Sequence, residues 1–142
     1  KKYGEINNWD VSNVTNMDSL FSGSVSGAQS FNQPLNNWNV SKVTDMYGMF
    51  ANARAFNQPL NKWDVSNVTN MQEMFREAVS FNQPLNKWNV SNVTNMRWVF
   101  SDATSFNQPL NNWNVSNVRY TYSSYIFWNA DSFNQQLHSP WY

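Results

Sequence analysis

The sequence of 142 residues lacks cysteine altogether and contains only four glycines. Without cysteine, the chain forms no disulfide framework, no thiolate metal site and no thiol nucleophile. With so few glycines, it carries no glycine-rich loop of the kind that cradles phosphates. The stability of the fold therefore has to come from other side chains.

Charge is scarce as well. Charged side chains make up 13% of the residues, and nine basic residues balance nine acidic ones. Binding to nucleic acid or to a membrane surface needs a basic face that attracts phosphates, so we expect neither partner. The sequence also has no run of eighteen apolar residues and no basic-then-apolar leader, so we expect a soluble piece with no membrane insertion in this segment.

Aromatic residues, at 17%, and twenty-five asparagines are in excess, and both belong to a repeat. The motif Phe-Asn-Gln-Pro-Leu recurs at intervals of 25 residues, beginning at Phe31, Phe56, Phe81 and Phe106. An altered copy begins at Phe133, and the opening segment carries only the second half of the unit. We predict one repeat domain, 1–142, with a degenerate N-terminal coil (1–30), regular repeats (31–55, 56–80 and 81–105), a C-terminal coil with an insertion (106–132) and a partial capping coil (133–142).

Each unit shows two periodicities in succession. The first is the tight alternation of a short strand, at Leu35, Trp38, Val40 and Val43. The second is the i, i+3, i+4, i+7 stripe of a short amphipathic helix, at Met46, Met49, Phe50 and Ala53. One such unit cannot bury both apolar faces, but stacked copies can. The pattern therefore predicts an α/β solenoid of about five strand-turn-helix coils with a short parallel sheet.

Stacking predicts continuous columns of like side chains inside the domain. We expect one inner column of tryptophans, formed by Trp9, Trp38, Trp63, Trp88 and Trp113, and parallel columns of phenylalanines. Full burial of each ring contributes about 1.5–3 kcal/mol to the stability of the fold before entropy is counted. We expect this burial to stabilise the domain in the absence of disulfides. Equivalent turn asparagines are expected to bond unpaired backbone groups, at Asn32, Asn57, Asn82, Asn107 and Asn134.

The repeated unit, Phe-Asn-Gln-Pro-Leu-Asn-x-Trp-Asp/Asn-Val-Ser-x-Val-Thr-x-Met-x-x-Met-Phe-x-x-Ala, resembles the repeat of bacterial surface proteins of the mycoplasma lipoprotein type. That family is similar to BspA-like leucine-rich repeats. The resemblance runs from about Ile6 to Leu137 and implies a right-handed, leucine-rich-repeat-like stack on a cell or virus surface. It also implies adhesion or partner recognition, with no common enzymatic activity.

The residues themselves predict no enzyme. The single histidine, His138, lies in the atypical tail, and no catalytic triad can be assembled around it. The carboxylates are isolated or lie beside basic residues, and their spacing matches neither a pair of glycosidase acids nor a calcium loop; they include Asp10, Asp64, Glu73, Glu77 and Asp102. We therefore predict no metal and no cofactor.

Function in a repeat protein is better sought where the copies differ, because the constant positions build the scaffold. The aromatic residues outside the core register gather toward the C-terminal coils, and exposed Trp, Tyr and Arg are the side chains that anchor interfaces. The predicted partner-binding residues are Tyr47, Arg97, Trp98, Tyr120, Tyr122, Tyr125 and Trp128. The same C-terminal aromatic residues, with Trp141 and Tyr142, also fit a cap that covers the open end of the stack.

Three functions remain open at this point. The leading hypothesis is a non-enzymatic recognition or adhesion module, extracellular or on a cell surface, that binds a protein partner. The alternatives are a structural subunit that self-associates end to end into oligomers or fibres, and a carbohydrate- or ice-binding solenoid. The near-identity of the copies also fits an engineered consensus with a designed binding face, and a longer parent protein would explain the abrupt ends.

Overall fold

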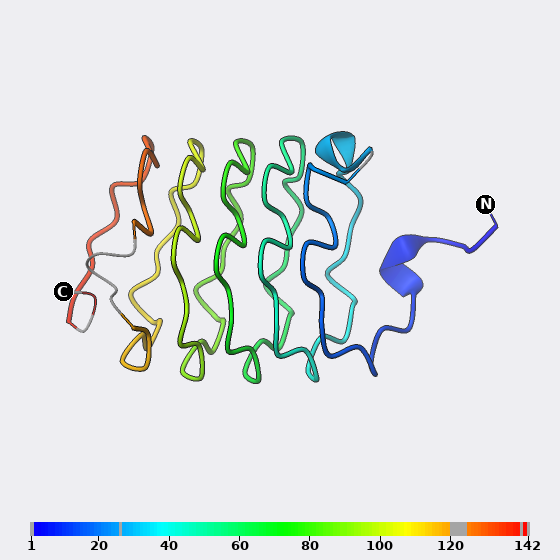
Figure 1. Ribbon diagram of the computed structural model, residues 1–142, viewed down its shortest axis with the longest axis horizontal. Helices are drawn as coiled ribbons and strands as arrows, with labels where there is room; N and C mark the ends of the chain where they lie inside the picture. Colours follow the sequence, from blue (N-terminus) through cyan, green and yellow to red (C-terminus); the bar gives the residue numbers. More distant parts are fainter. Residues whose placement is uncertain (1, 26, 120–124, 140, 142) are drawn as a thin grey trace.

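The computed structural model describes residues 2–25, 27–119, 125–139 and 141. The chain winds into successive coils that lie side by side along the long axis, with the N-terminal arm beyond the first coil (Figure 1). Its regular elements are two short 3-10 helices, η1 (Ile6–Asn8) and η2 (Ala28–Ser30). Three isolated parallel bridges join neighbouring coils, at Asn16–Asp45, Asp45–Asn70 and Asn70–Asn95.

The prediction of a right-handed, leucine-rich-repeat-like α/β solenoid is therefore wrong. The described residues form no α-helix, and their parallel pairing is limited to single bridges, so they build no strand and no sheet. The backbone of each coil is mostly irregular and runs from turn to turn.

The segment predicted as a helix, residues 46–53, consists of consecutive β-turns. The N–H of Met49 donates to the carbonyl of Met46, and the N–H of Ala53 donates to that of Phe50, at 3.2 and 3.1 Å. The third residue of each turn has a left-handed φ of 58°, at Gly48 and Asn52, as type II turns require. Two such turns place the same four apolar side chains on one side of the segment. A helix-like spacing of apolar residues is therefore compatible with a backbone that is not helical.

The hydrogen bonds of this segment explain why it forms turns and not a helix. Alternate N–H groups donate to the next coil: Met46 to Asn70, Gly48 to Gln72, Phe50 to Met74 and Asn52 to Arg76. The N–H groups between them close the turns within the segment, and that of Tyr47 donates to the Asp45 side chain. Every backbone donor from 46 to 53 is thus satisfied while the segment binds its neighbour.

The segment predicted as a strand is also built from turns. The N–H of Trp38 donates to the Leu35 carbonyl and that of Val43 to the Val40 carbonyl, at 3.0 and 2.9 Å. Its apolar side chains nevertheless point inward, because Leu35, Trp38, Val40 and Val43 are all at most 4% exposed. The alternation therefore identified the buried residues correctly and the backbone wrongly.

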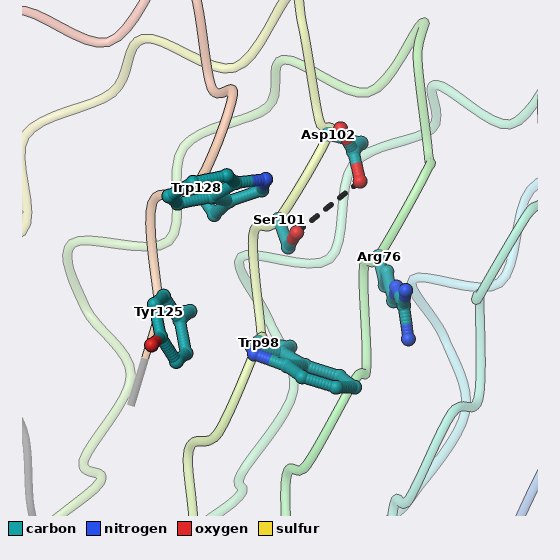
Figure 2. A pocket seen from close by; sticks show the side chains of 6 residues that line it. All are labelled: Arg76, Trp98, Ser101, Asp102, Tyr125 and Trp128. Atoms are coloured by element: carbon teal, nitrogen blue, oxygen red, sulfur yellow. Dashed lines mark hydrogen bonds between the residues drawn. The ribbon is translucent and has the colours of Figure 1, made fainter. Parts of the chain in front are cut away.

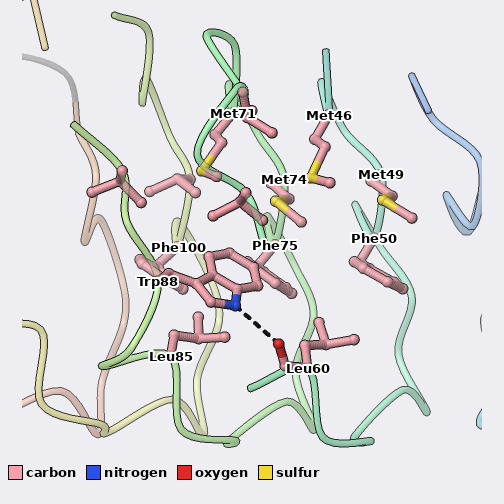
Figure 3. Close-up of a cluster of buried hydrophobic side chains, with 14 of the residues drawn as sticks. Met46, Met49, Phe50, Leu60, Met71, Met74, Phe75, Leu85, Trp88 and Phe100 are labelled. Atoms are coloured by element: carbon pink, nitrogen blue, oxygen red, sulfur yellow. Dashed lines mark hydrogen bonds between the residues drawn. The ribbon is translucent and has the colours of Figure 1, made fainter. Parts of the chain in front are cut away.

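The predicted phenylalanine columns are confirmed. One runs with ring centroids 5.6–5.8 Å apart, through Phe21, Phe50, Phe75, Phe100 and Phe127. A second runs beside it at spacings of 6.0–6.1 Å, through Phe31, Phe56, Phe81, Phe106 and Phe133. Methionines of the turn segments pack on the same core (Figure 3).

The tryptophan column is confirmed only in part. Trp63, Trp88 and Trp113 stack at 6.3–6.4 Å, and Trp141 extends the column with a further spacing of 6.3 Å. Trp9 is 43% exposed instead, and its indole donates to the carbonyl of Tyr3 in the N-terminal arm. The indoles of four tryptophans also donate a hydrogen bond to the coil before them, as Trp88 does to the Leu60 carbonyl at 2.9 Å (Figure 3); these are Trp38, Trp63, Trp88 and Trp113.

The predicted role of the turn asparagines is confirmed as well. The Oδ1 of each one accepts the backbone N–H of the equivalent asparagine in the next coil, at 2.9–3.1 Å, along Asn32, Asn57, Asn82, Asn107 and Asn134. The glutamine that follows reaches back to the same asparagine, as Gln83 does to Asn57. The asparagine excess is thus a ladder of side-chain to backbone bonds between coils.

Replacing Trp88 with Phe is expected to lower the free energy of unfolding by roughly 2–4 kcal/mol, because it removes buried volume and leaves the Leu60 carbonyl without its donor. Chemical denaturation measures this change. Trp9→Phe is the matched control, since the Trp9 indole bonds an exposed carbonyl of Tyr3. An equal loss in both variants would contradict the burial argument.

Glu77 sits in the left-handed region with φ of 60°, whereas Asn52 and Asn129 hold the equivalent place in other coils. Asparagine tolerates this conformation better than glutamate. Glu77→Asn is therefore expected to raise the free energy of unfolding by roughly 0.5–1 kcal/mol. Thermal denaturation would show the gain as a higher Tm, and a lower Tm would mean that the Glu77 side chain has a favourable contact that outweighs the strain.

Candidate partner-binding surface

The residues that differ between coils lie at the outward positions of the turn segments. Within each segment the apolar residues are buried, and the second and third residues of each turn are the variable ones. The hydrogen-bond register between coils therefore places variable residues from different repeats beside one another on one surface. Toward the C-terminal end this surface becomes aromatic, with Trp98, Tyr125 and Trp128.

Three aromatic side chains surround a hollow of about 320 Å³ on this surface, and the full lining is Arg76, Trp98, Ser101, Asp102, Tyr125 and Trp128. In Figure 2, Trp98, Tyr125 and Trp128 border one side, while Arg76 and Asp102 lie on the other. Tyr125 and Trp128 meet edge to face, with ring centroids 5.6 Å apart, and are 51% and 56% exposed. Ser101 is 3% exposed and donates to Asp102 at 3.2 Å. We call these six residues the aromatic hollow.

Arg76 connects the aromatic hollow to a polar network on the preceding coils. Its guanidinium lies 4.4 Å from the centre of the Trp98 ring and forms an ion pair of 2.9 Å with Glu73. Glu73 also accepts hydrogen bonds from Tyr47 at 3.2 Å and from Gln72 at 3.3 Å. The Nε of Arg76 is buried and has no hydrogen-bond partner among the described residues, so this network leaves one donor unused.

The two aromatic residues of the third turn position, Trp98 and Tyr125, have left-handed φ values of 60° and 54°. A bulky residue in this region is a genuine outlier, at a cost on the order of 1–3 kcal/mol. Gly48 occupies the equivalent place without that cost. Packing offsets part of this strain cost at Trp98 and Tyr125, since Arg76 covers the Trp98 ring and Trp128 contacts that of Tyr125.

The structure brings together three of the predicted partner-binding residues, Trp98, Tyr125 and Trp128. Arg97 is exposed, with its guanidinium 5.3 Å from the Trp98 ring centre, but it does not line the aromatic hollow. Tyr47 is half-buried and reaches the site only through Glu73 and Arg76. Tyr120 and Tyr122 lie outside the described residues.

Sequence reasoning missed the polar half of the aromatic hollow, namely Arg76, Ser101 and Asp102. The 25-residue register of the repeat is the feature of the sequence that could have revealed these residues. Arg76 and Ser101 are 25 residues apart, so stacking of the coils places them side by side, and Asp102 adjoins Ser101. A choice of binding residues by aromatic character favoured the neighbouring Trp98, Tyr125 and Trp128 instead.

The described part of the chain holds no group of three or more histidine, cysteine, aspartate or glutamate side chains placed to bind a metal ion. A search of the same residues finds no helix with the length and apolarity needed to span a membrane.

Comparison with known protein families gives one match, made twice along the chain. A family described as "Mycoplasma protein of unknown function, DUF285" matches residues 2–71 and residues 58–141. The chain therefore belongs to this family. The match supports the mycoplasma-type repeat and gives no support to the likeness to BspA-like leucine-rich repeats. No curated protein and no solved structure matches the chain.

Glu73 raises the pKa of the Tyr47 phenol above its ordinary value, chiefly through the repulsion between its carboxylate and a phenolate. The unfolded chain therefore loses this proton at a lower pH than the folded one, so the stability that Tyr47 contributes is present below about pH 10 and is lost as the pH rises further. Subtracting the phenolate absorbance titration of Tyr47→Phe from that of the wild type isolates this group. Glu73→Gln should lower its titration midpoint, and an unchanged midpoint would contradict the assigned cause.

Proposed function

We propose that the chain is a non-enzymatic recognition module, extracellular or on a cell surface, that binds a protein partner through the aromatic hollow. The observation that carries this proposal is the cluster of Trp98, Tyr125 and Trp128 around one hollow, with two of the three rings more than half exposed. Elsewhere in the repeat the aromatic columns are stacked and largely buried. The sequence resemblance to repeat proteins of bacterial surfaces agrees with that location.

A protein partner suits the composition of the aromatic hollow. Tryptophan, tyrosine and arginine are the residues most enriched among those that dominate binding energy at protein interfaces. The volume, about 320 Å³, is at the lower limit of small-molecule pockets. It suits a single anchor side chain of a partner whose remaining surface rests on the neighbouring coils.

The polar groups beside the rings favour a partner that also offers hydrogen bonds. Asp102 accepts from Ser101 and Asn129 and forms no ion pair within the described residues, so its carboxylate retains acceptor capacity. Arg76 lies on the same side of the hollow, with its guanidinium held by Glu73. Leaving such groups unpaired under a bound partner costs free energy, so they select partners that satisfy them.

The backbone strain at Trp98 and Tyr125 also supports a recognition role. Strained residues persist where the surrounding structure over-determines them, and they gather at functional sites. A scaffold role alone does not need these side chains, because glycine or glutamate holds the equivalent turn position in other coils, at Gly48 and Glu73.

Selection of a random peptide library on the immobilised protein tests the proposal. The double variant Trp98→Ala/Tyr125→Ala is expected to lose the peptides that the wild type enriches, with a Tm that stays nearly unchanged. Tyr3→Ala is the matched control, because Tyr3 is also an exposed aromatic residue and is 71% accessible.

A double variant that still enriches the same peptides would contradict the proposal, as would an unfolded one, which would make these side chains structural. Signal on a glycan array that depends on Trp98 and Tyr125, without any peptide enrichment, would instead assign the aromatic hollow to carbohydrate.

A further inference from the structure

Among the side chains that line the aromatic hollow, the carboxylate of Asp102 is the charge without a counter-ion in the described part of the chain. Arg76, the other charged residue of the lining, forms an ion pair of 2.9 Å with Glu73. Asp102 accepts hydrogen bonds only from uncharged groups, at 3.2 Å from Ser101 and at 3.0 Å from Asn129. The aromatic hollow therefore carries an uncompensated negative charge beside its rings.

The scaffold does not need a carboxylate at this position. Asp102 has a left-handed φ of 58°, and Asn52 and Asn129 hold the equivalent turn position in other coils with φ of 58° and 56°. The N–H groups of Asn52 and Asp102 both donate to the next coil, at 2.6 and 2.7 Å. Asparagine thus fulfils the structural role, and the addition that aspartate makes is its charge.

The surface around the aromatic hollow is acidic as well. The turn segments of the first four coils, residues 17–24, 46–53, 71–78 and 96–103, contain two arginines and four acidic residues, which are Asp18, Glu73, Glu77 and Asp102. The lysines of the repeats are exposed on other parts of their coils, at Lys42, Lys62 and Lys87. A surface of this charge favours the approach of a positively charged partner.

A lysine or arginine side chain matches the two sides of the aromatic hollow. Figure 2 shows the rings of Tyr125 and Trp128 on one side and the carboxylate of Asp102 on the other. Basic side chains bury their aliphatic stems along apolar surface while the charged end reaches a polar group. The faces of aromatic rings also attract cations. The rings and the carboxylate therefore favour the same charge in an incoming side chain.

Anchors of other charge fit less well. A neutral or acidic side chain that covers the hollow would remove water from Asp102 without supplying a counter-charge, and an unpaired charge is costly to bury. Arg76 does not offer an anion site in compensation. Its guanidinium is paired with Glu73 and lies 4.4 Å from the centre of the Trp98 ring, and its side chain points away from Asp102 in Figure 2.

We propose that the aromatic hollow binds a basic anchor, a lysine or arginine side chain of a protein partner, whose charged group pairs with Asp102 while its stem lies on Tyr125 and Trp128. This inference rests on the proposed function and gives the chemistry of the partner. The remaining surface of the partner then contacts the acidic turn segments of the preceding coils.

Four random peptide libraries on the immobilised protein test this inference. They differ in one fixed central residue, which is lysine, arginine, leucine or glutamate, and the wild type is expected to enrich peptides from the lysine and arginine libraries only. Asp102→Asn should weaken the binding of a synthetic peptide from these two libraries at least about tenfold, because the anchor loses its counter-charge. The Tm should stay nearly unchanged, since asparagine holds this turn position in other coils.

Glu77→Asn is the matched control. It removes an acidic residue from the equivalent position of the preceding coil, outside the lining of the aromatic hollow. The affinity of the same peptide should change by less than about twofold, because a charge outside the contact is screened by water and salt. Equal losses in Glu77→Asn and Asp102→Asn would mean attraction by overall charge and would overturn the inference.

The other outcomes distinguish a failure of this inference from a failure of the proposed function. Enrichment from the leucine or glutamate library that depends on Trp98 and Tyr125 would overturn the basic anchor and leave recognition through the aromatic hollow in place. Binding of basic peptides that is unchanged in Asp102→Asn would also overturn the basic anchor. Enrichment from none of the four libraries would overturn the proposed function and the basic anchor together.

Discussion

The structure depends on the hydrogen bonds that each turn segment donates to the next coil. The N–H groups of Met46, Gly48, Phe50 and Asn52 all leave their own segment and bind the following one. This arrangement fixes the distance between coils and so sets the spacing of the aromatic columns. Rings 5.6–6.1 Å apart are a consequence of backbone pairing as much as of ring attraction.

Side-chain periodicity predicted which residues are buried but not the backbone that buries them. Met46, Met49, Phe50 and Ala53 are all fully buried, as the helical spacing required. A pair of turns with bonds from residue i to i+3 brings the same four side chains inward, so the spacing is compatible with both paths. Gly48, Asn52 and Asn129 are residues that favour left-handed turns, whereas the equivalent Glu73, Trp98 and Asp102 gave no such indication in the other coils.

The candidate site was predictable to the extent that it follows from differences between repeats. Trp98, Tyr125 and Trp128 stand out because the equivalent residues of the earlier coils are not aromatic, and the structure places them around one hollow. Arg76 and Asp102 do not stand out, since isolated charges are common on any surface. Their proximity depends on stacking across coils, which becomes visible only once the register is known.

The pairing of each coil with its neighbours has a mechanical consequence. Neighbouring coils lie side by side along the long axis, and the bonds between their turn segments run from each coil to the next one (Figure 1). A force applied between the two ends is therefore carried by the coils in series, and each interface bears the whole load. Such a molecule lengthens one coil at a time, as the bonds between one pair of neighbouring coils break before those of the next pair.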